Sequence, residues 1–194
     1  MQARFLTSAA RPEGFPDDDG AEVAFVGRSN SGKSSAINRI AGRTRLARVS
    51  KTPGRTRLIN FFELAEGARI VDLPGYGFAR VPDTVREAWR ALVDGYFAGR
   101  RSIAGLVLTV DIRRGLKDGD ETLLAMAAGL GIPVAILLTK SDKLSRGRGS
   151  GEALDVRGAI GDSAEVILFS ARDGTGVEAA RRHLLGWLGI GAGG

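Results

Sequence analysis

Short runs of apolar residues alternate along this chain with segments whose apolar positions recur every three to four residues. The runs are rich in Val, Ile, Leu and Phe, which is typical of buried strands, and the periodic segments are typical of amphipathic helices. The predicted strands span 22–26, 58–64, 68–72, 104–110, 133–138 and 165–169. The predicted helices span 33–41, 83–99, 119–130, 150–160 and 176–188. This alternation predicts an α/β fold, a mostly parallel sheet with helices on both faces.

One pair of strands breaks the parallel pattern. The second and third predicted strands are joined by "AEGA" at 65–68, which is too short for a parallel crossover and predicts an antiparallel hairpin. We therefore expect six strands with one antiparallel strand at the edge. We also expect a single domain over 1–194, with a polar N-terminal extension at 1–20 and a flexible tail at 189–194. The stretch "SRGRGSG" at 145–151 is expected to be a surface loop.

The clearest chemical signal follows the first predicted strand. The stretch "FVGRSNSGKSS" at 25–35 satisfies G-x-x-x-x-G-K-[ST] through Gly27, Gly32, Lys33 and Ser34. In such a loop, between a strand and a helix, backbone N–H groups cradle phosphates and the helix directs its positive end at them. We expect Lys33 to contact the outer phosphates and the hydroxyl of Ser34 to bind Mg²⁺.

Two later stretches favour guanine over adenine. In "VDLPGYG", Asp72 can reach Mg²⁺ from a strand end and the amide of Gly75 can sense the terminal phosphate. In "LLTKSDKL", Asp142 lies at the carboxyl edge of the sheet, where it can accept two hydrogen bonds from guanine. Adenine offers no such pair of donors, so the site is expected to reject ATP. The stem of Lys140 would cover the base, and "FSA" at 169–171 would present a backbone N–H to guanine O6.

These motifs predict a guanine-nucleotide site at the carboxyl ends of successive strands. Its phosphate-binding loop consists of Gly27, Arg28, Ser29, Asn30, Ser31, Gly32, Lys33, Ser34 and Ser35. Its D-x-x-G stretch consists of Asp72, Leu73, Pro74 and Gly75. Its base-reading residues are Thr139, Lys140, Ser141, Asp142, Phe169, Ser170 and Ala171.

The chain resembles the EngB-type (YihA-type) ribosome-biogenesis GTPases of the Era-related superfamily, from about Phe5 to about Trp187. The similar stretches are "GRSNSGKSSAIN" (27–38), "SKTPGRTRLINFF" (50–62), "DLPGYGFARVP" (72–82), "WRALVDGYFAGR" (89–100), "DIRRGLKDGD" (111–120) and "TKSDKLSRG" (139–147). This resemblance implies a Ras-like fold, GTP and GDP binding with slow hydrolysis, and Mg²⁺ as cofactor. It also implies a role in assembly of the large ribosomal subunit and a link to cell division.

The resemblance further implies a first switch segment along the nucleotide. Thr56 would join Ser34 as a ligand of Mg²⁺, with Asp72 acting through water, and Thr52 remains an alternative to Thr56. Lys33, Thr56 and Gly75 would support the transition state. The implied switch residues are Gly54, Arg55, Thr56, Arg57 and Leu58.

Two residues bear on the rate of hydrolysis. Tyr76 stands where Ras-type enzymes place the glutamine that orients the attacking water, so we assign no catalytic residue. We expect slow intrinsic GTP hydrolysis that a partner or an ion accelerates. Asn30 would ligate K⁺, as the resemblance to potassium-stimulated members suggests, or would only stabilise its own turn. Both interpretations of Asn30 remain open.

The charge of the chain points to a polyanionic partner. The net charge is +6 and the pI is about 10.3, which favours phosphate contacts. The family resemblance implies that this partner is the large ribosomal subunit, through rRNA and ribosomal proteins, and not DNA. Arg55, Arg57 and Arg80 would contact rRNA or remain solvated. The absence of cysteine excludes disulfides and thiol chemistry, and the lack of a long apolar run predicts no membrane partner and a cytoplasmic location. We expect a monomer, although no sequence feature bears on the oligomeric state.

The remaining candidates have plainer interpretations. His183 is expected to be a surface or cap residue rather than a general base, and Trp89 and Tyr96 are expected to pack in the core. Asp111 is expected to cap its strand end or pair with Arg113. A signalling switch that acts on a protein effector is the alternative function, and a metabolic kinase would not need T-K-S-D.

Overall fold

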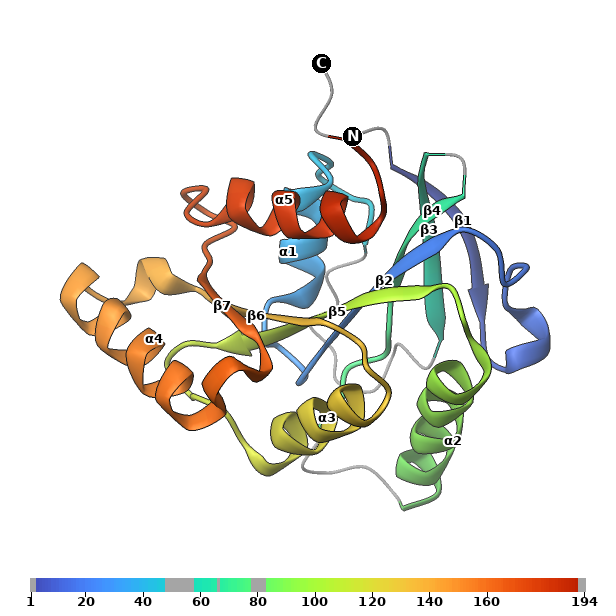
Figure 1. Cartoon of the computed structure of the whole chain (residues 1–194), viewed down its shortest axis with the longest axis horizontal. Helices are drawn as coiled ribbons and strands as arrows, with labels where there is room; N and C mark the ends of the chain where they lie inside the picture. The colour runs from blue at the N-terminus through green and yellow to red at the C-terminus, as the bar shows by residue number, and fades with distance from the viewer. Residues whose placement is uncertain (1–2, 48–57, 66, 78–82, 192–194) are drawn as a thin grey trace.

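The structure is a computed structural model that describes residues 3–47, 58–65, 67–77 and 83–191 (Figure 1). One seven-stranded sheet has the strand order β1-β3-β4-β2-β5-β6-β7. Its strands are β1 (Arg4–Ala9), β2 (Ala21–Gly27), β3 (Ile59–Ala65), β4 (Ala68–Asp72), β5 (Ile103–Asp111), β6 (Val134–Thr139) and β7 (Glu165–Leu168). The α-helices are α1 (Lys33–Ile40), α2 (Asp83–Gly99), α3 (Asp118–Gly129), α4 (Arg146–Ile160) and α5 (Val177–Trp187).

Five strands run parallel, and the hairpin between β3 and β4 is antiparallel as the short connection predicted. The predicted α/β fold is therefore confirmed, but the sheet has seven strands instead of six. The additional strand, β1, pairs antiparallel with β3 and lies outside it, so β3 is not the edge. Most of β1 is exposed, and Phe5 contacts the ring of Phe62 across the pair with centroids 6.0 Å apart. No buried apolar run marks this strand in the sequence.

The expectation of a surface loop at 145–151 is wrong, because α4 begins at Arg146. Gly149 is buried, and a Cβ there would lie 4.0 Å from side-chain atoms of Ile112 and Leu168. This packing stabilises a helical turn that its glycines disfavour. At the other end of the chain, Ile190 packs against the core, and residues 192–194 of the predicted tail lie outside the described residues.

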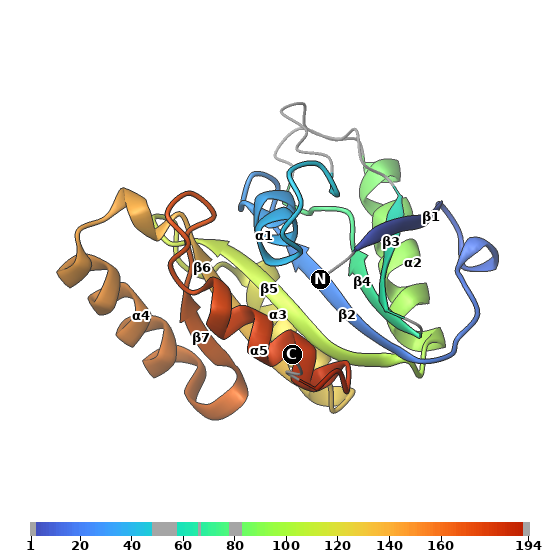
Figure 2. The same cartoon turned by 90° about the horizontal axis from the view of Figure 1, so that it is seen from above.

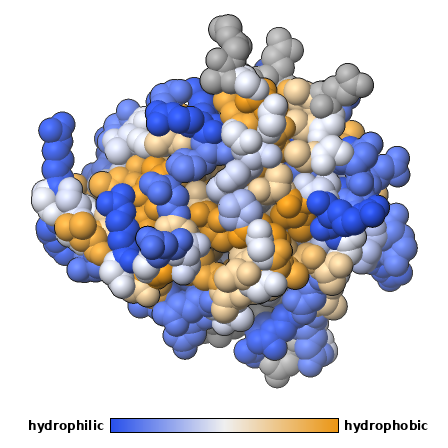
Figure 3. Space-filling view, in the orientation of Figure 1, coloured by the Kyte–Doolittle hydropathy of each residue, from blue (hydrophilic) through white to orange (hydrophobic). Residues whose placement is uncertain are grey.

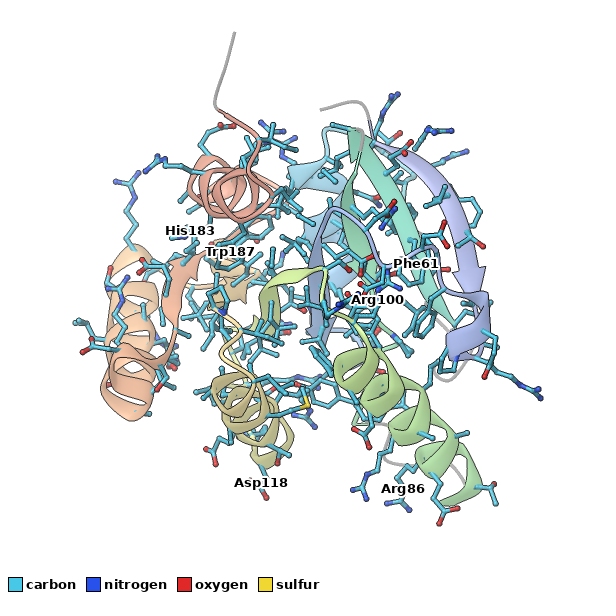
Figure 4. All side chains as sticks on the ribbon, turned by 45° about the vertical axis from the view of Figure 1, so that its right-hand side comes forward. Phe61, Arg86, Arg100, Asp118, His183 and Trp187 are labelled. Atoms are coloured by element: carbon cyan, nitrogen blue, oxygen red, sulfur yellow. The ribbon has the colours of Figure 1, made fainter. Side chains whose placement is uncertain are left out.

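Two hydrophobic clusters occupy the two faces of the sheet (Figures 1 and 2). On one face α1 and α5 lie side by side over Phe25 and Phe169. On the other face α2, α3 and α4 cover the sheet. Tyr96 is fully buried and Trp89 is partly buried in this second cluster, which confirms both as packing residues. His183 is half-buried beside Trp187, with ring centroids 6.0 Å apart (Figure 4).

A buried ionic cluster holds the amino edge of the sheet, where β2 begins and α2 ends. The Glu22 carboxylate is fully buried and accepts hydrogen bonds from Arg100 Nη2 (2.5 Å), Arg100 Nε (2.8 Å) and the Tyr96 hydroxyl (3.0 Å). Arg69 Nη1 lies 3.4 Å from the same carboxylate. The Arg100 guanidinium also lies over the Phe61 ring, 5.6 Å from its centroid (Figure 4). We call these residues, Glu22, Arg69, Tyr96 and Arg100, the amino-edge cluster.

The surface combines polar and apolar side chains in the usual way. In the space-filling view, hydrophobic side chains show in the middle of the face and hydrophilic side chains lie mostly around its rim (Figure 3). Leu130 and Leu154 are among the exposed apolar residues. In the part of the chain that the structure describes, no helix has both the length and the apolar character needed to cross a membrane.

Candidate nucleotide site

The loop between β2 and α1 has the backbone of a phosphate cradle. Asn30 and Gly32 both have positive φ, 64° and 96°, and Gly32 immediately precedes α1. A Cβ at Gly32 would lie 3.3 Å from Thr139 Oγ1, so both the conformation and the space favour glycine. No side chain caps the start of α1. The first N–H groups of this helix therefore lack both intrahelical partners and a side-chain cap, and such helix starts bind anions.

The D-x-x-G stretch is fastened to this loop by backbone hydrogen bonds. The Ser29 amide donates to the Tyr76 carbonyl (2.9 Å), and the Tyr76 amide donates to the Gly27 carbonyl (3.3 Å). A Cβ on Gly75 would lie 3.3 Å from Ser29 Oγ, and a Cβ on Gly27 would lie 2.2 Å from Thr109 Oγ1. The close contact requires glycine at position 27 and leaves little room at position 75, and the parallel pairing of β2 with β4 brings the two stretches together.

Lys33 and Asp72 form an ion pair at the floor of the loop. Lys33 Nζ is hydrogen-bonded to Asp72 Oδ1, and the two side chains are only 11% and 6% exposed. Asn60 Nδ2 lies 3.5 Å from the second oxygen of Asp72. Ser34, the next residue of α1, is partly buried. The residues predicted to contact phosphate and Mg²⁺ therefore lie together, although Asp72 is 39 positions from Lys33.

The first half of T-K-S-D is fastened to the same loop from the other side. Thr139 ends β6, and its hydroxyl is hydrogen-bonded to the Ser31 carbonyl. Lys140 follows in a left-handed conformation, with φ of 60°, and its Nζ donates to the Asn30 carbonyl at 2.7 Å. The same ammonium pairs with Asp111 Oδ2 at 2.9 Å.

Asp111, at the end of β5, joins Arg113 to Lys140. Arg113 Nη2 lies 2.7 Å from Asp111 Oδ2, which confirms the expected pair. Burial acts to raise the pKa of Asp111, but the hydrogen bonds from Arg113 and Lys140 outweigh it and hold that pKa well below its usual range. The contact with Lys140 was missed by sequence reasoning. The signal was available, because β5 and β6 are parallel neighbours and Asp111 pairs in register with Thr139.

The second half of T-K-S-D meets the loop that follows β7. Ser170 is fully buried, and its hydroxyl donates to Asp142 Oδ1 at 2.9 Å. The Ser141 amide donates to the Phe169 carbonyl at 3.1 Å, and Ala171 lies partly buried beside them. The structure thus brings together the two stretches expected to read the base. Sequence reasoning missed that the Ser170 hydroxyl orients Asp142, since it predicted only a backbone N–H from 169–171.

The Tyr76 side chain is held by residues of α2 and α3. Its buried hydroxyl donates to the carboxylate of Asp120 in α3. Its ring contacts Trp89, with centroids 5.8 Å apart, and Trp89 Nε1 donates to the Pro74 carbonyl at 2.8 Å. Burial, together with the neighbouring Asp120 carboxylate, raises the pKa of Tyr76. Burial also raises the pKa of Asp120, against the opposing effect of the Tyr76 hydrogen bond.

Part of the predicted site falls on residues that the structure does not describe. Leu58 is described, lies just before β3 and is 38% exposed. The other switch residues and related candidates, Thr52, Gly54, Arg55, Thr56, Arg57 and Arg80, lie outside the described residues.

A glycine-bounded loop between a strand and a helix, a D-x-x-G stretch bonded to it and a T-K-S-D stretch at the same sheet edge define this protein as a P-loop GTPase. Residues 22–140 match the family model described as "50S ribosome-binding GTPase". The chain is 52% identical over 190 residues to "Probable GTP-binding protein EngB" of Azoarcus sp. (strain BH72), covering 96% of this chain and 91% of the relative. It is 50% identical over 191 residues to the protein of the same name from Coxiella burnetii (strain RSA 493 / Nine Mile phase I), covering 97% and 93%. The chain therefore belongs to the EngB family of GTP-binding proteins.

Solved structures agree with this assignment. The crystal structure of a probable GTP-binding protein engB superimposes with a TM-score of 0.70 at 26% identity, covering 87% of this chain and 98% of that chain. A structure of Aquifex aeolicus Era bound to GDP.AlF4- superimposes with a TM-score of 0.69 at 20% identity, covering 87% and 57%. The latter likeness extends to the fold alone.

Proposed function

We propose that this GTPase is a guanine-nucleotide switch that hydrolyses GTP slowly and acts in assembly of the large ribosomal subunit, with cell division depending on that assembly. The observation that carries the ribosomal part is the match of residues 22–140 to a family of 50S ribosome-binding GTPases. The net charge of +6 supports a partner rich in phosphate. Such a role would place the protein in the cytoplasm as a monomer.

The phosphate end of the site suits a nucleotide with Mg²⁺. Ser34 and Asp72 supply a hydroxyl and a carboxylate oxygen, the donors that Mg²⁺ prefers, and Thr56 would complete the set. Lys33, now paired with Asp72, would turn its ammonium to the outer phosphates, and the amide of Gly75 would sense the terminal one. Bound Mg²⁺ neutralises charge on the phosphates. The residues from Gly27 to Ser35 would provide the cradle, and Leu73 and Pro74 would border it.

The base end of the site suits guanine. Asp142 accepts one hydrogen bond from Ser170, so it keeps acceptor capacity for the N1–H and amino groups of guanine. Lys140 would cover the base while its ammonium stays on Asn30 and Asp111. Thr139, Ser141, Phe169 and Ala171 would shape the pocket around the base, with the last contributing an N–H to O6.

Slow hydrolysis is supported by the orientation of Tyr76. Its hydroxyl is engaged with Asp120, so this side chain does not orient a water molecule at the phosphates. Transition-state support would come from Lys33, Gly75 and Thr56. Asn30 adopts the left-handed conformation that asparagine tolerates better than most residues, which is sufficient reason for an asparagine in the turn. A K⁺ ligand role is tested by replacing K⁺ with Na⁺, and an unchanged hydrolysis rate would exclude it.

The ribosomal role is tested by co-sedimentation with separated ribosomal subunits, in GDP and in a non-hydrolysable GTP analogue, at low and moderate salt. We expect binding to the large subunit in the analogue, weaker in GDP, and declining with salt as phosphate contacts do. The variant Asp142→Asn, impaired in guanine binding, should lose the dependence on nucleotide. Equal, weak binding to both subunits in either nucleotide would contradict the proposal and favour a protein effector.

The proposed link to cell division is tested by the order in which defects appear. Depletion of the protein from its host should first lower the number of complete large subunits and only later disturb division. Division defects that precede any loss of large subunits would separate the two roles.

A further inference from the structure

The helices α1 and α5 lie side by side on one face of the sheet (Figures 1 and 2). Arg181 in α5 donates from Nε to the Ile40 carbonyl at 2.8 Å, and its Nη2 lies 3.3 Å from the Arg39 carbonyl. These carbonyls end α1, where a positive charge is stabilising. The two helices are therefore tied together at a cationic position.

The segment that follows α1 is folded back onto the same surface. The Asn38 side chain donates to the Ala47 carbonyl (2.9 Å) and accepts from the Ala47 amide (2.7 Å), and both residues are buried. The Arg43 amide donates to the Asn38 carbonyl at 2.9 Å. Arg43 and Arg45 are exposed between these fixed points, so their guanidinium groups extend from a well-held backbone.

This surface concentrates positive charge. We call Arg39, Arg43, Arg45, Arg181 and Arg182 the arginine patch. Across 33–47 and 177–187 the only acidic residue is Glu178, and its Oε1 lies 2.7 Å from Arg181 Nη1. These two stretches contain no further acidic residue to neutralise the other four arginines of the patch. The helices of the opposite face carry more acidic residues: α3 contains three and no basic residue, and α4 places two among its three arginines.

We propose that the arginine patch docks the phosphodiester backbone of folded RNA, an inference that rests on the proposed ribosomal function and adds a second contact to it. The planar guanidinium group of arginine binds phosphate oxygens in pairs, and contacts to phosphate fix position without reading sequence. The patch is carried by two helices and a braced segment that pack on the core. It therefore binds RNA in both nucleotide states, while the dependence on GTP arises from the switch segments.

The test removes charge from the patch and leaves its framework intact. The triple variant R43Q/R45Q/R182Q changes three exposed side chains and retains Arg181, which bonds to α1. The matched control R101Q/R146Q/R148Q removes three exposed arginines elsewhere, including Arg101, whose side chain is 94% exposed. Binding to separated large subunits and to a short RNA duplex of arbitrary sequence is measured in GDP and in the GTP analogue, at about 50 to 200 mM salt.

For the patch variant, the slope of log affinity against log salt should fall by about 2 to 3 units, because each phosphate contact contributes roughly 0.9 on a duplex. Affinity at moderate salt should fall at least about tenfold in both nucleotide states, and by less than about threefold in the control. GTP hydrolysis and the melting temperature should match those of the wild type in both variants, which shows that neither fold nor site is disturbed.

Other outcomes separate this inference from the proposed function. Unchanged binding by the patch variant, or equal weakening by the control, would overturn the patch while GTP-dependent binding of the wild type upholds the ribosomal role. Loss of subunit binding with unchanged duplex binding would assign the patch to an acidic protein surface and overturn RNA as its partner. Patch-dependent binding to the duplex without binding to either subunit would uphold the patch and contradict the ribosomal role.

Discussion

Both ends of the sheet's strands carry largely buried carboxylates, but these carboxylates differ in how many hydrogen bonds they accept from buried groups of the protein. At the amino edge, Glu22 accepts hydrogen bonds from the Tyr96 hydroxyl and from Arg100, and a longer one of 3.4 Å from Arg69 Nη1. At the carboxyl edge, Asp142 accepts one side-chain hydrogen bond, from the Ser170 hydroxyl on Oδ1. Its Oδ2 lies 3.4 Å from Lys143 Nζ and 3.9 Å from Arg172 Nη1, two cations on exposed side chains. A carboxylate has about four acceptor sites. Glu22 therefore has most of its acceptor capacity filled, whereas Asp142 retains capacity for a ligand.

The number of internal hydrogen bonds therefore distinguishes a carboxylate that stabilises the fold from one that can bind a ligand. The side chains of Glu22 and Asp142 are 0% and 12% exposed, so both are largely buried and burial alone would class them together. Removing a carboxylate with many internal partners leaves buried charges unpaired and costs stability. Removing one with few internal partners costs ligand binding instead. Four substitutions test this distinction.

The largest effect is expected at the amino edge. Glu22→Ala leaves the buried Arg100 guanidinium without its nearest carboxylate, while Arg69 keeps its pair with Asp19, and should lower the free energy of unfolding by about 3–5 kcal/mol. The nucleotide affinity of the folded protein should stay within about twofold, a change below about 0.5 kcal/mol. Urea unfolding and titration with a fluorescent GTP analogue measure the two quantities. The control Glu63→Ala removes an exposed pair with Arg4 and should cost less than about 1 kcal/mol.

The next effect is expected at the carboxyl edge. Asp142→Asn replaces an acceptor with a donor that faces the guanine amino group, and should weaken GTP binding about 100-fold, or roughly 3 kcal/mol. Xanthine carries a carbonyl in place of that amino group, so binding of XTP should improve. Stability should change by less than about 1 kcal/mol. Unaltered GTP affinity would show that Asp142 does not bind the base. The control is Asp155→Asn, which changes an exposed carboxylate on α4.

A smaller effect is expected where the D-x-x-G stretch meets α3. Tyr76→Phe removes the hydroxyl that bonds to buried Asp120 and should lower stability by about 1–3 kcal/mol. The loss should shrink at low pH, where Asp120, with its raised pKa, is protonated and needs no donor. Single-turnover GTP hydrolysis should remain within about twofold, about 0.4 kcal/mol in barrier height. A tenfold fall would give the Tyr76 hydroxyl a role in the chemistry. Thr122→Ala, which removes an exposed hydroxyl, is the control.

The smallest effect depends on pH and lies at the amino edge. The Asp18 carboxylate accepts hydrogen bonds from the amides of Arg101 (2.9 Å) and Ser102 (3.0 Å), and the first of these contributes most to lowering its pKa to about 2. A lowered pKa stabilises the fold above the unfolded value of about 3.9, and this contribution is lost as pH falls toward 2. Asp18→Asn should therefore cost about 1 kcal/mol at neutral pH, after allowance for partial solvent exposure, and nothing near pH 2. Urea unfolding from neutral pH to pH 2 measures this difference in stability, with Asp17→Asn as the control. A difference between wild type and Asp18→Asn that stays constant with pH would contradict the prediction.

Local sequence patterns were sufficient for most of the secondary structure and for the core of the candidate site. The apolar runs and helical periodicities placed every α-helix and six of the seven strands of the described residues, mostly within one or two residues at each end. The phosphate loop is also local, because Gly27, Gly32, Lys33 and Ser34 are spaced within one strand, turn and helix. Such features depend on interactions between residues close in the chain.

Tertiary structure decided the features that need partners from distant parts of the chain. Strand β1 pairs with β3, fifty to fifty-nine residues away, and Gly149 in the first turn of α4 packs near Leu168. Ser170 with Asp142 and Tyr76 with Asp120 are contacts over 28 and 44 positions. The sequence alone determined which residues carry the chemistry. The packing of the sheet decided which of their polar atoms are satisfied by the protein and which remain available to a ligand, because hydrogen-bond partners are chosen in space.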